Sequence, residues 1–550
     1  MTRSLKILAA QLNPIVGDIS GNQEMARRAH IEASRVGADL LVFPELFIIG
    51  YPPEDLVLKP SAADMCRLAI EALAPITEDG PAILIGTPWK EGRDLFNSVI
   101  LLQSGKITGR YDKYELPNYG VFDEVRLFTG GTTPGSVFCI SGVNVGVAIC
   151  EDLWYRRVPS ALKDAGAELI VAPNASPWRR TIQAERAQAF DAWADLQLPY
   201  LFVNQVGGQD ELVFDGASYA TNGRFAERCQ FGDEFRPGTA CVTFSEGRFQ
   251  HDPDTGTDNM DPCEADYRAT VLALSDYVTK NGFPGVVLGL SGGIDSALTA
   301  AIAVDALGPE RVWCVMMPSK YTSTESLEDA RDCAEKLGVR YDTLHIEAGV
   351  NAVGQMLTPI FESTKPDTTE ENIQSRLRGL TLMALSNKFG YMVVTTGNKS
   401  EMAVGYATLY GDMCGGYNAL KDFYKTEVVS LSRWRNHHHP EGVLGPAGTV
   451  IPDRIITKPP SAELREDQKD EDSLPSYEVL DDILRGLVDH EEDVGDIVAR
   501  GHDESVVRRI EHLLYVAEYK RRQAPPGVKI GPRNFGRDRR YPITNRFRDD

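Results

Sequence analysis

The stretch Leu288-Gly-Leu-Ser-Gly-Gly-Ile-Asp-Ser-Ala297 decides the fold of the second half of the chain. An apolar run at 286–290 passes into a turn rich in serine and glycine at 291–296, and then into a helix-like run at 297–303. Glycines lack a β-carbon, so the backbone can turn sharply and bring its amide groups close to phosphate oxygens. The start of the following helix adds positive potential. The stretch therefore predicts a phosphate-binding turn between a strand and a helix.

Asp295 in this turn would repel a phosphate unless a cation lay between them, so we expect it to hold magnesium on a triphosphate. The turn contains no lysine and so differs from the GxxxxGK[ST] nucleotide pattern. A glycine-rich turn that binds nothing is the alternative. The hexapeptide SGGIDS resembles the pyrophosphate loop of ATP pyrophosphatases, which adenylate a carboxylate or carbonyl oxygen and release pyrophosphate. That resemblance implies ATP contacts at Gly289, Leu290, Ser291, Gly292, Gly293, Ile294, Asp295 and Ser296.

Length and composition limit the class of protein. A chain of 550 residues is too long for one core and suggests two or three domains. Its net charge of −22 argues against nucleic acid or an anionic membrane surface as the main partner. No apolar run approaches the length of a membrane span, and the apolar part of the start is too short for a signal peptide, so we expect a cytoplasmic protein. The nine cysteines show no CxxC spacing and are expected to be buried thiols, with one reactive exception.

Alternating apolar runs and helix-like stretches divide the chain. From residue 4 to about 245 this rhythm predicts a layered α/β domain. The segment from His251 to Pro262 is acidic and rich in turn residues, so we predict domains at 1–250 and 264–550 with a linker at 251–263. The second domain repeats the rhythm and predicts a doubly wound parallel sheet, whose ligands bind at the carboxyl ends of its strands.

Three residues of the first domain follow apolar strands or a turn, where rigid scaffolds present chemistry: Glu45, Lys113 and Cys150. Together they suit amide hydrolysis. Glu45 would take the thiol proton and pass it to departing ammonia, while Lys113 would favour the thiolate and the tetrahedral oxyanion. Taken singly, Cys150 would more often be a buried core thiol, Glu45 a helix-start carboxylate and Lys113 a surface charge.

The segments around these residues, FPE at 43–45, DKYELPNYGVFDE at 112–124 and ICEDLW at 149–154, resemble the nitrilase superfamily. The resemblance implies a four-layer αββα sandwich. LPNY at 116–119 and NASP at 174–177 are similar to its glutaminase branch, which implies that Tyr119 and Ser176 contact glutamine and that Glu124 is a second, orienting carboxylate. The branch carries a basic residue a few positions after Ser-Pro. Arg179 and Arg180 lie slightly earlier here, so the partner of the glutamine carboxylate stays open, with Arg180 as our candidate.

Motifs of the second domain resemble, in order, the synthetase domain of the NAD synthetases. They are SGGIDSA, then ENIQSRLR at 371–378, TGNKSE at 396–401, YGD at 410–412, YK at 424–425 and KPPSAEL at 458–464. The resemblance implies an adenine nucleotide alpha hydrolase-like fold. It also implies roles for single residues: Asp295 and Glu401 as magnesium ligands, Thr396, Lys425 and Ser461 as ATP contacts, and Asn372, Arg376, Glu401 and Lys520 as contacts for deamido-NAD.

The whole chain therefore resembles the glutamine-dependent NAD synthetases. We expect an enzyme that uses ATP, Mg²⁺, glutamine and deamido-NAD, acts as a homo-oligomer, and carries ammonia internally between its sites. The alternatives are another ATP-pyrophosphatase amidotransferase, or a scaffold with an inactive nitrilase-like half. An N-terminal cysteine mechanism is excluded because position 2 is Thr2. The segment 463–472 and the arginine-rich tail from Ala524 look too polar to form core, and we expect both to help close the second site.

Overall fold

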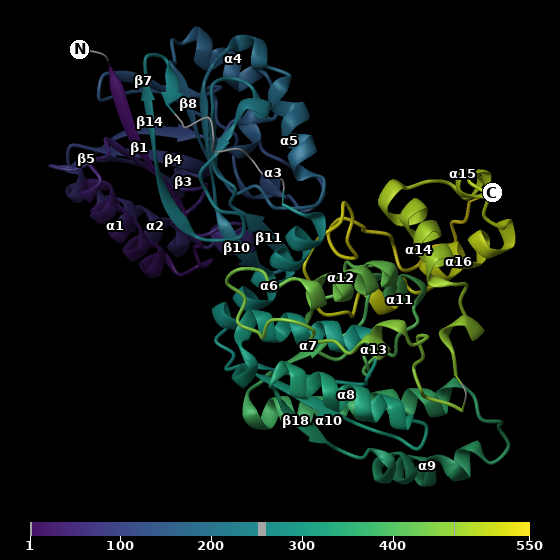
Figure 1. The fold of residues 1–550 in the computed structure, drawn as a ribbon. Coiled ribbons are helices and arrows are strands. Elements are labelled where there is room, and N and C mark those ends of the chain that lie inside the picture. The colour runs from purple at the N-terminus through teal and green to yellow at the C-terminus, as the bar shows by residue number, and fades with distance from the viewer. Residues whose placement is uncertain (1–2, 251–259, 467, 550) are drawn as a thin grey trace. The chain divides into compact units, whose positions relative to one another are not determined.

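A computed structural model describes residues 3–250, 260–466 and 468–549, and the chain divides into two compact units, Met1–Met260 and Asp261–Asp550 (Figure 1). Most of the predicted linker, 251–259, lies outside the described residues. Its last two residues already belong to helix α6, which begins at Pro262 with Asp261 as its N-cap. The Asp261 carboxylate accepts from the backbone N–H groups of Cys263 and Glu264, which satisfies two amide groups that a helix start leaves unpaired.

The first unit is built on two sheets. The larger has the strand order β15-β14-β1-β2-β3-β4-β5 and the smaller β13-β12-β9-β8-β7-β6. The strands of the larger sheet are β1 (Ser4–Gln11), β2 (Leu40–Val42), β3 (Ala82–Glu91), β4 (Asp94–Gln103), β5 (Lys106–Asp112), β14 (Gly238–Ser245) and β15 (Arg248–Gln250). Those of the smaller are β6 (Ser136–Ile140), β7 (Val143–Val147), β8 (Leu169–Asn174), β9 (Tyr200–Asn204), β12 (Tyr219–Thr221) and β13 (Cys229–Gln230), while β10 (Val206–Gln209) and β11 (Leu212–Asp215) form a separate hairpin.

Each sheet has one face against the other sheet and one face against helices. Successive side chains of a strand point to opposite faces, so Ile7 belongs to the core between the sheets and Leu8 to the core under α1 and α2. On the far face of the smaller sheet, Leu162 and Phe190 of α4 and α5 pack on Phe202. The predicted four-layer αββα sandwich is confirmed (Figure 1). The helices are α1 (Ile19–Arg35), α2 (Pro60–Leu73), α3 (Glu124–Leu127), α4 (Arg157–Asp164) and α5 (Ile182–Asp191).

The second unit contains a parallel sheet with the order β18-β17-β16-β19-β20. Its strands are β16 (Val286–Gly289), β17 (Val312–Met316), β18 (Arg340–Thr343), β19 (Met392–Thr395) and β20 (Tyr417–Asn418). The chain begins the sheet at β16, adds β17 and β18 on one side, and returns to add β19 and β20 on the other. The predicted doubly wound sheet is therefore confirmed, and its switch point lies between β16 and β19, where ligands bind in such folds.

Helices cover this sheet and continue beyond it. They are α6 (Pro262–Lys280), α7 (Ile294–Leu307), α8 (Thr324–Leu337), α9 (Glu347–Phe361), α10 (Thr368–Phe389), α11 (Lys399–Val404), α12 (Lys425–His437), α13 (Asp453–Thr457), α14 (Tyr477–Leu484), α15 (Val494–Ala499), α16 (Glu504–Val516) and α17 (Glu518–Arg521). No helix among the described residues is long and apolar enough to cross a membrane.

The arginine-rich tail differs from its prediction. Val528, Ile530 and Phe535 are buried, so the expectation that the tail is too polar to form core is wrong. Its charges are neutralised inside the fold. Lys529 pairs with Asp538, and Arg539 donates to Glu518 at 2.8 Å. The prediction assumed that charged residues stay in solvent. A guanidinium or ammonium group can be buried when its carboxylate partner is buried with it.

Candidate active sites

A fully buried lysine is the hub of the site in the first unit. Lys113 Nζ lies 2.6 Å from Glu45 Oε1 and 2.9 Å from both carboxylate oxygens of Glu124. Lys113 follows β5, Glu45 follows β2, and Glu124 opens α3. The structure thus brings three of the predicted residues into direct contact. One ammonium between two carboxylates fixes the direction of all three side chains.

Two neutral groups and one close backbone approach hold Glu45 in place. Asn97 Nδ2 donates to Glu45 Oε1 at 2.7 Å, and the Ala175 N–H donates to Glu45 Oε2 at 3.2 Å. A β-carbon on Gly86 of β3 would lie 2.3 Å from the Leu46 nitrogen. Only glycine lets this strand pass so close to the turn that carries Glu45.

Cys150 begins a short 3₁₀ turn, Cys150–Leu153, at the end of β7. Its φ of 44° is left-handed, a conformation that is uncommon for a residue with a side chain and that recurs at functional sites. Asp152 locks this turn to the Lys113 segment. Its carboxylate accepts from the Ile149 N–H at 2.8 Å, the Glu115 N–H at 2.9 Å and the Tyr111 hydroxyl at 2.8 Å.

Burial and charge set the protonation of this site. Burial raises the pKa of the Cys150 thiol and Glu45 raises it further, while Lys113 lowers it by less, so the resting nucleophile is a thiol. Lys113 therefore favours the thiolate, as predicted, but does not by itself create it. Burial also raises the pKa of Glu124 to about 7, against the opposing effect of Lys113. Burial alone would lower the pKa of Lys113, but Glu124 and Glu45 raise it and keep it charged.

The predicted glutamine contacts occupy different environments. The Tyr119 hydroxyl donates to Glu151, the buried residue after the nucleophile, at 3.0 Å. Ser176 is buried, and its Oγ accepts from Arg186 of α5 at 3.0 Å. Arg180 is exposed. Glutamine binding by these residues stays a prediction.

Arg186 was missed by the sequence argument. Its side chain is buried, and its NH1 donates to Asp215 Oδ2 at 3.2 Å. Asn204 Nδ2 donates to Asp215 Oδ1 at 3.0 Å, and Asn204 Oδ1 accepts from the Ser176 N–H at 2.9 Å. The network holds Ser176 from both its backbone and its hydroxyl. The sequence evidence for a buried Arg186 is weak, because the residue lies on a helix rich in polar residues, where an arginine is usually solvated.

The second unit contains a cavity of about 310 Å³ at the switch point of its sheet. Every residue of the predicted phosphate loop lines it, as do Thr396, Glu401, Lys425 and Ser461. Gly292 has φ +81°, and a β-carbon there would lie 2.4 Å from the Ser326 carbonyl oxygen. Glycine is therefore required at position 292 for two reasons: the left-handed backbone conformation of the turn and its close packing against α8.

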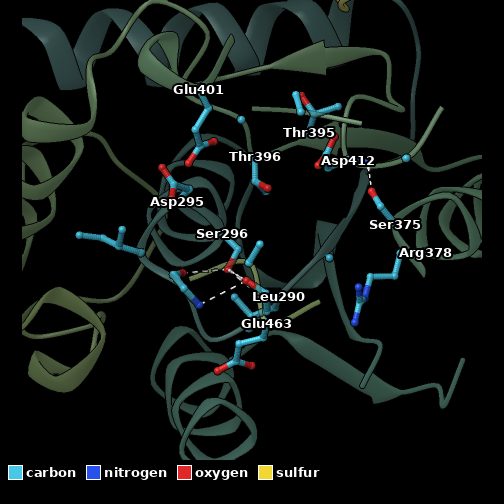
Figure 2. Close-up of a pocket in the computed structure, with 18 of the residues that line it drawn as sticks. Leu290, Asp295, Ser296, Ser375, Arg378, Thr395, Thr396, Glu401, Asp412 and Glu463 are labelled. Atoms are coloured by element: carbon cyan, nitrogen blue, oxygen red, sulfur yellow. Dashed lines mark hydrogen bonds between the residues drawn. The ribbon is translucent and has the colours of Figure 1, made fainter. Parts of the chain in front are cut away.

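Two carboxylates face one another at the start of α7 and in α11. Figure 2 shows Asp295 and Glu401 pointing together beside Thr396. Lys425 Nζ bridges them, in contact with Asp295 and 3.2 Å from Glu401 Oε1, and Asn398 Nδ2 donates to Asp295 Oδ1 at 2.8 Å. Burial raises the pKa of Glu401 to about 7, partly opposed by Lys425. The site thus gathers two anionic oxygen ligands and one buried ammonium.

Three of the four residues expected to contact deamido-NAD hold one segment, 405–412, while the fourth, Glu401, lines the cavity. Asn372 Oδ1 accepts from the Thr408 hydroxyl at 2.9 Å, and Arg376 Nε donates to the Leu409 carbonyl at 3.2 Å. Lys520 Nζ donates to the carbonyls of Gly405 and Ala407 at 2.8 and 2.7 Å. None of Asn372, Arg376 and Lys520 lines the cavity itself, whereas Ala407 and Asp412 of the same segment do.

Further charged residues line the cavity, among them Arg378, Lys458 and Glu463. Arg378 is partly buried, and its Nε donates to the Met317 carbonyl at 3.0 Å. Lys458 Nζ donates to Glu463 at 3.1 Å, and the Glu463 carboxylate accepts from Ser326 Oγ at 2.7 Å. The segment after Ser461 is therefore tied to the start of α8, next to the phosphate loop.

The folds and sites define a two-site enzyme, in which a carbon–nitrogen hydrolase unit is joined to a nucleotide-binding synthase unit. The family model for carbon-nitrogen hydrolase matches residues 6–243, and that for NAD synthase matches residues 266–524. The glutamine-dependent NAD(+) synthetase of Rhodobacter capsulatus is 50% identical, with 100% of both chains covered. That of Xanthomonas campestris is 46% identical, with 99% of this chain and 98% of the relative covered.

Solved structures of proteins with the same two-unit fold support this family assignment. The glutamine-dependent NAD+ synthetase from Acinetobacter baumannii, in complex with ADP, is 40% identical with a TM-score of 0.78, over 98% of this chain and 99% of that one. The enzyme from Cytophaga hutchinsonii shares the fold at 21% identity, with a TM-score of 0.80, over 99% and 98%. The chain belongs to the glutamine-dependent NAD(+) synthetases, ligases that use glutamine as the amide donor.

Proposed function

We propose that the chain converts deamido-NAD, ATP and glutamine into NAD, AMP, pyrophosphate and glutamate, with Cys150 as the glutaminase nucleophile. The observation that carries the proposal is the presence, on one chain, of a complete Glu45–Lys113–Cys150 centre and a cavity lined by the SGGIDS loop. Either site alone would fit a hydrolase or a nucleotide-binding protein. The pair fits transfer of glutamine nitrogen to an ATP-activated acid.

The glutaminase step starts from a thiol. Glu45 takes the Cys150 proton as the thiolate attacks the carboxamide carbon, and Lys113 stabilises the oxyanion that forms. Collapse of the tetrahedral intermediate breaks the carbon–nitrogen bond, and Glu45 returns the proton to the departing ammonia. Water then attacks the thioester with Glu45 as base, releasing glutamate and restoring the thiol. Glu124 acts through Lys113, whose direction it fixes.

We assign the residues that bind glutamine by matching their charge and hydrogen-bonding groups to those of the substrate. Glu151 offers a buried carboxylate to the α-ammonium group, with Tyr119 fixing its position. Ser176 offers a hydroxyl that Arg186 orients. Arg180 remains our candidate for the α-carboxylate, because an arginine side chain at the surface can close over a bound amino acid.

Mg²⁺ and ATP fit the second site. No group of three or more His, Cys, Asp or Glu that could hold a metal is found among the described residues, so the protein offers few ligands of its own. This suits Mg²⁺, which keeps several waters and is held by one or two carboxylates plus substrate phosphates. Asp295 and Glu401 would hold it, and it would neutralise the charge that develops on pyrophosphate. The ADP complex of the relative from Acinetobacter baumannii supports adenine nucleotide binding here.

The synthetase step is an adenylation followed by amide formation. The nicotinate carboxylate attacks the α-phosphorus of ATP, pyrophosphate leaves, and ammonia then displaces AMP from the acyl adenylate. Lys425 and the amide groups of the phosphate loop absorb the charge of the leaving pyrophosphate. Asn372, Arg376 and Lys520 hold the deamido-NAD beside segment 405–412.

The active form is proposed to be a homo-oligomer. No residue of α9 is buried, although the helix is largely apolar. Met356, Ile360 and Leu380 are more than 60% exposed, at 73%, 74% and 64%, and an apolar hollow between α9 and α10 is lined by Val353, Leu377 and Met383. A second copy of the chain would cover this face from both sides, as symmetric dimers do.

All nine cysteines are free, which supports a reducing, cytoplasmic location.

The test is to follow AMP and pyrophosphate formation from ATP with deamido-NAD, using glutamine or ammonium as nitrogen source. NAD should form with both. Activity with a different acid, and none with deamido-NAD, would favour another amidotransferase. NAD formation from ammonium with no hydrolysis of glutamine would favour the inactive-half alternative.

A further inference from the structure

Helices α7 and α12 are joined by two ion pairs at equal spacing. At their first turns, Lys425 of α12 contacts Asp295 of α7. At their last turns, Arg435 of α12 donates to Asp305 of α7, with Nε–Oδ2 at 2.6 Å and NH2–Oδ1 at 3.0 Å. On each helix the two partners are ten residues apart, since 305 − 295 and 435 − 425 are both 10. Ten residues span about 15 Å of helix, so the two helices run in the same direction and in matched register.

The two pairs differ in surroundings. The first pair lines the nucleotide cavity, where ligands change its environment. The second is sealed, because Asp305 and Arg435 side chains are both 0% exposed and neither residue lines the cavity. Asp305 and Arg435 form a bidentate pair, the geometry that fixes both distance and rotation.

Further contacts fix the sealed pair from outside the two helices. The Tyr267 hydroxyl of α6 donates to Asp305 Oδ2 at 2.5 Å. Arg435 NH2 also donates to the Pro446 carbonyl at 2.7 Å, and the Leu444 N–H donates to the Asp305 carbonyl at 2.9 Å. The Asp305 carboxylate is therefore held by Tyr267 as well as by Arg435, while the Arg435 guanidinium and the Asp305 backbone are each tied to segment 444–446.

We infer that Asp305, Arg435 and Tyr267 form a positioning network that sets the register of α12 against α7 and thereby places Lys425 on Asp295. A helix is stiff along its axis, so a register fixed at the last turns is carried to the first turns. None of the three residues touches the cavity, so they act through Lys425 and Asp295. The inference rests on the proposed function only in taking the cavity as the site of ATP chemistry.

The energetics favour a role in register rather than in overall stability. A buried ion pair often adds little net stability, because desolvation of both charges offsets their attraction. A shift of about 1 Å at reacting groups can cost about 10²-fold in rate. Since Lys425 must meet charge on a leaving phosphate, its placement affects kcat more than ground-state binding of ATP.

The test compares two conservative variants of the full-length enzyme, Arg435→Lys and Tyr267→Phe. Lysine keeps the charge beside Asp305 but loses the fork, and phenylalanine loses one hydroxyl. Arg311→Lys is the matched control, because the Arg311 guanidinium also uses its fork, donating to the carbonyls of Pro284 and Phe283 in the same unit, and does not line the cavity. Ammonium-supported NAD formation gives kcat and the KM for ATP, glutamate release without ATP reports the other unit, and thermal unfolding reports stability.

We expect Arg435→Lys to lower the kcat of ammonium-supported NAD formation by about 10-fold to 100-fold. The KM for ATP, the rate of glutamate release without ATP, and the Tm should change little relative to the control. Tyr267→Phe should lower kcat in the same direction by a smaller factor. Variants that lose Tm but keep wild-type kcat would show a purely structural pair and overturn the inference. An equal loss in Arg311→Lys would overturn it as well. Wild-type enzyme that made no NAD would instead contradict the proposed function.

Discussion

Lys113 donates a 2.6 Å hydrogen bond to Glu45, and neither side chain is exposed to solvent. The contact makes the ammonium and the general base one unit, which Glu124 completes from the other side. Burial and Glu45 raise the pKa of the Cys150 thiol, so the thiolate has to be generated by proton transfer to a base. This arrangement limits reaction of the thiol with other electrophiles.

Replacing Cys150 separates the two activities. We expect Cys150→Ala to abolish glutamine-supported NAD synthesis and to keep most ammonium-supported synthesis, because the second unit carries all the ATP chemistry. Both rates are measured as NAD formation with each nitrogen source. Cys66→Ala is the control, since Cys66 is another buried thiol of the same unit, on α2, and is not one of the predicted site residues. Equal loss with both nitrogen sources would mean that Cys150 is structural.

Glu124 should give the glutaminase a pH dependence near neutrality. Its pKa of about 7 means that it becomes protonated as the pH falls below 7, and Lys113 then pairs with Glu45 alone. Glu45 would accept the thiol proton less readily, so glutamate release without ATP should fall on the acid side of pH 7 and level off above it. Glu124→Gln should lower the rate by about 10²-fold and remove this step. A wild-type profile that is flat from pH 6 to 8 would contradict the assignment.

The magnesium ligands should be separable from the glutaminase. Asp295→Asn and Glu401→Gln should each abolish pyrophosphate release at ordinary Mg²⁺ concentrations, because the leaving group loses its counter-charge. Both variants should still form the thioester at Cys150, which mass spectrometry with a slow amide substrate can detect. Glu335→Gln, an exposed acid of α8, should behave as wild type. Near-normal synthesis at low Mg²⁺ in either variant would reject the role.

The two activities should be coupled. Ammonia released into water at neutral pH becomes mostly ammonium, which is not a nucleophile, so two sites on one chain favour internal transfer. We expect glutamate production to rise when ATP and deamido-NAD are both present. With ¹⁵N-glutamine in excess unlabelled ammonium, most label should reach NAD. Free dilution of the label, together with an unchanged hydrolysis rate, would mean that ammonia travels through solvent.

The exposed apolar face of α9 and α10 should control assembly. Met356→Glu combined with Leu380→Glu should lower the molar mass measured by light scattering, because like charges would face each other across a symmetric interface. Met65→Glu, at a 53% exposed position of α2 in the other unit, is the matched control. The same mass for both variants and the wild type would place any interface elsewhere.

Much of the fold follows from local sequence pattern. The strand Val312–Met316 and the helix Thr324–Leu337 follow the alternation of apolar runs and helix-like stretches that was predicted for the second domain. Ser323 caps that helix, and Gly338 ends it in a left-handed conformation, so both signals are local. The order of the motifs was sufficient to predict Glu45, Lys113 and Cys150 as one site, because each follows an apolar strand or a turn.

Long-range partners were decided by the tertiary structure alone. Arg435 and Asp305 are 130 residues apart, and nothing near either residue indicates that they pair. Likewise, a charge-rich helix gives no sign that Arg186 is buried against Ser176 while Arg180 is exposed, and the basic tail gives none that Arg539 lies inside the fold. Local pattern specifies the backbone conformation of an element and which of its faces is apolar. Which buried charges meet depends on packing between distant elements, because a charge can be buried only where the rest of the chain supplies its partner.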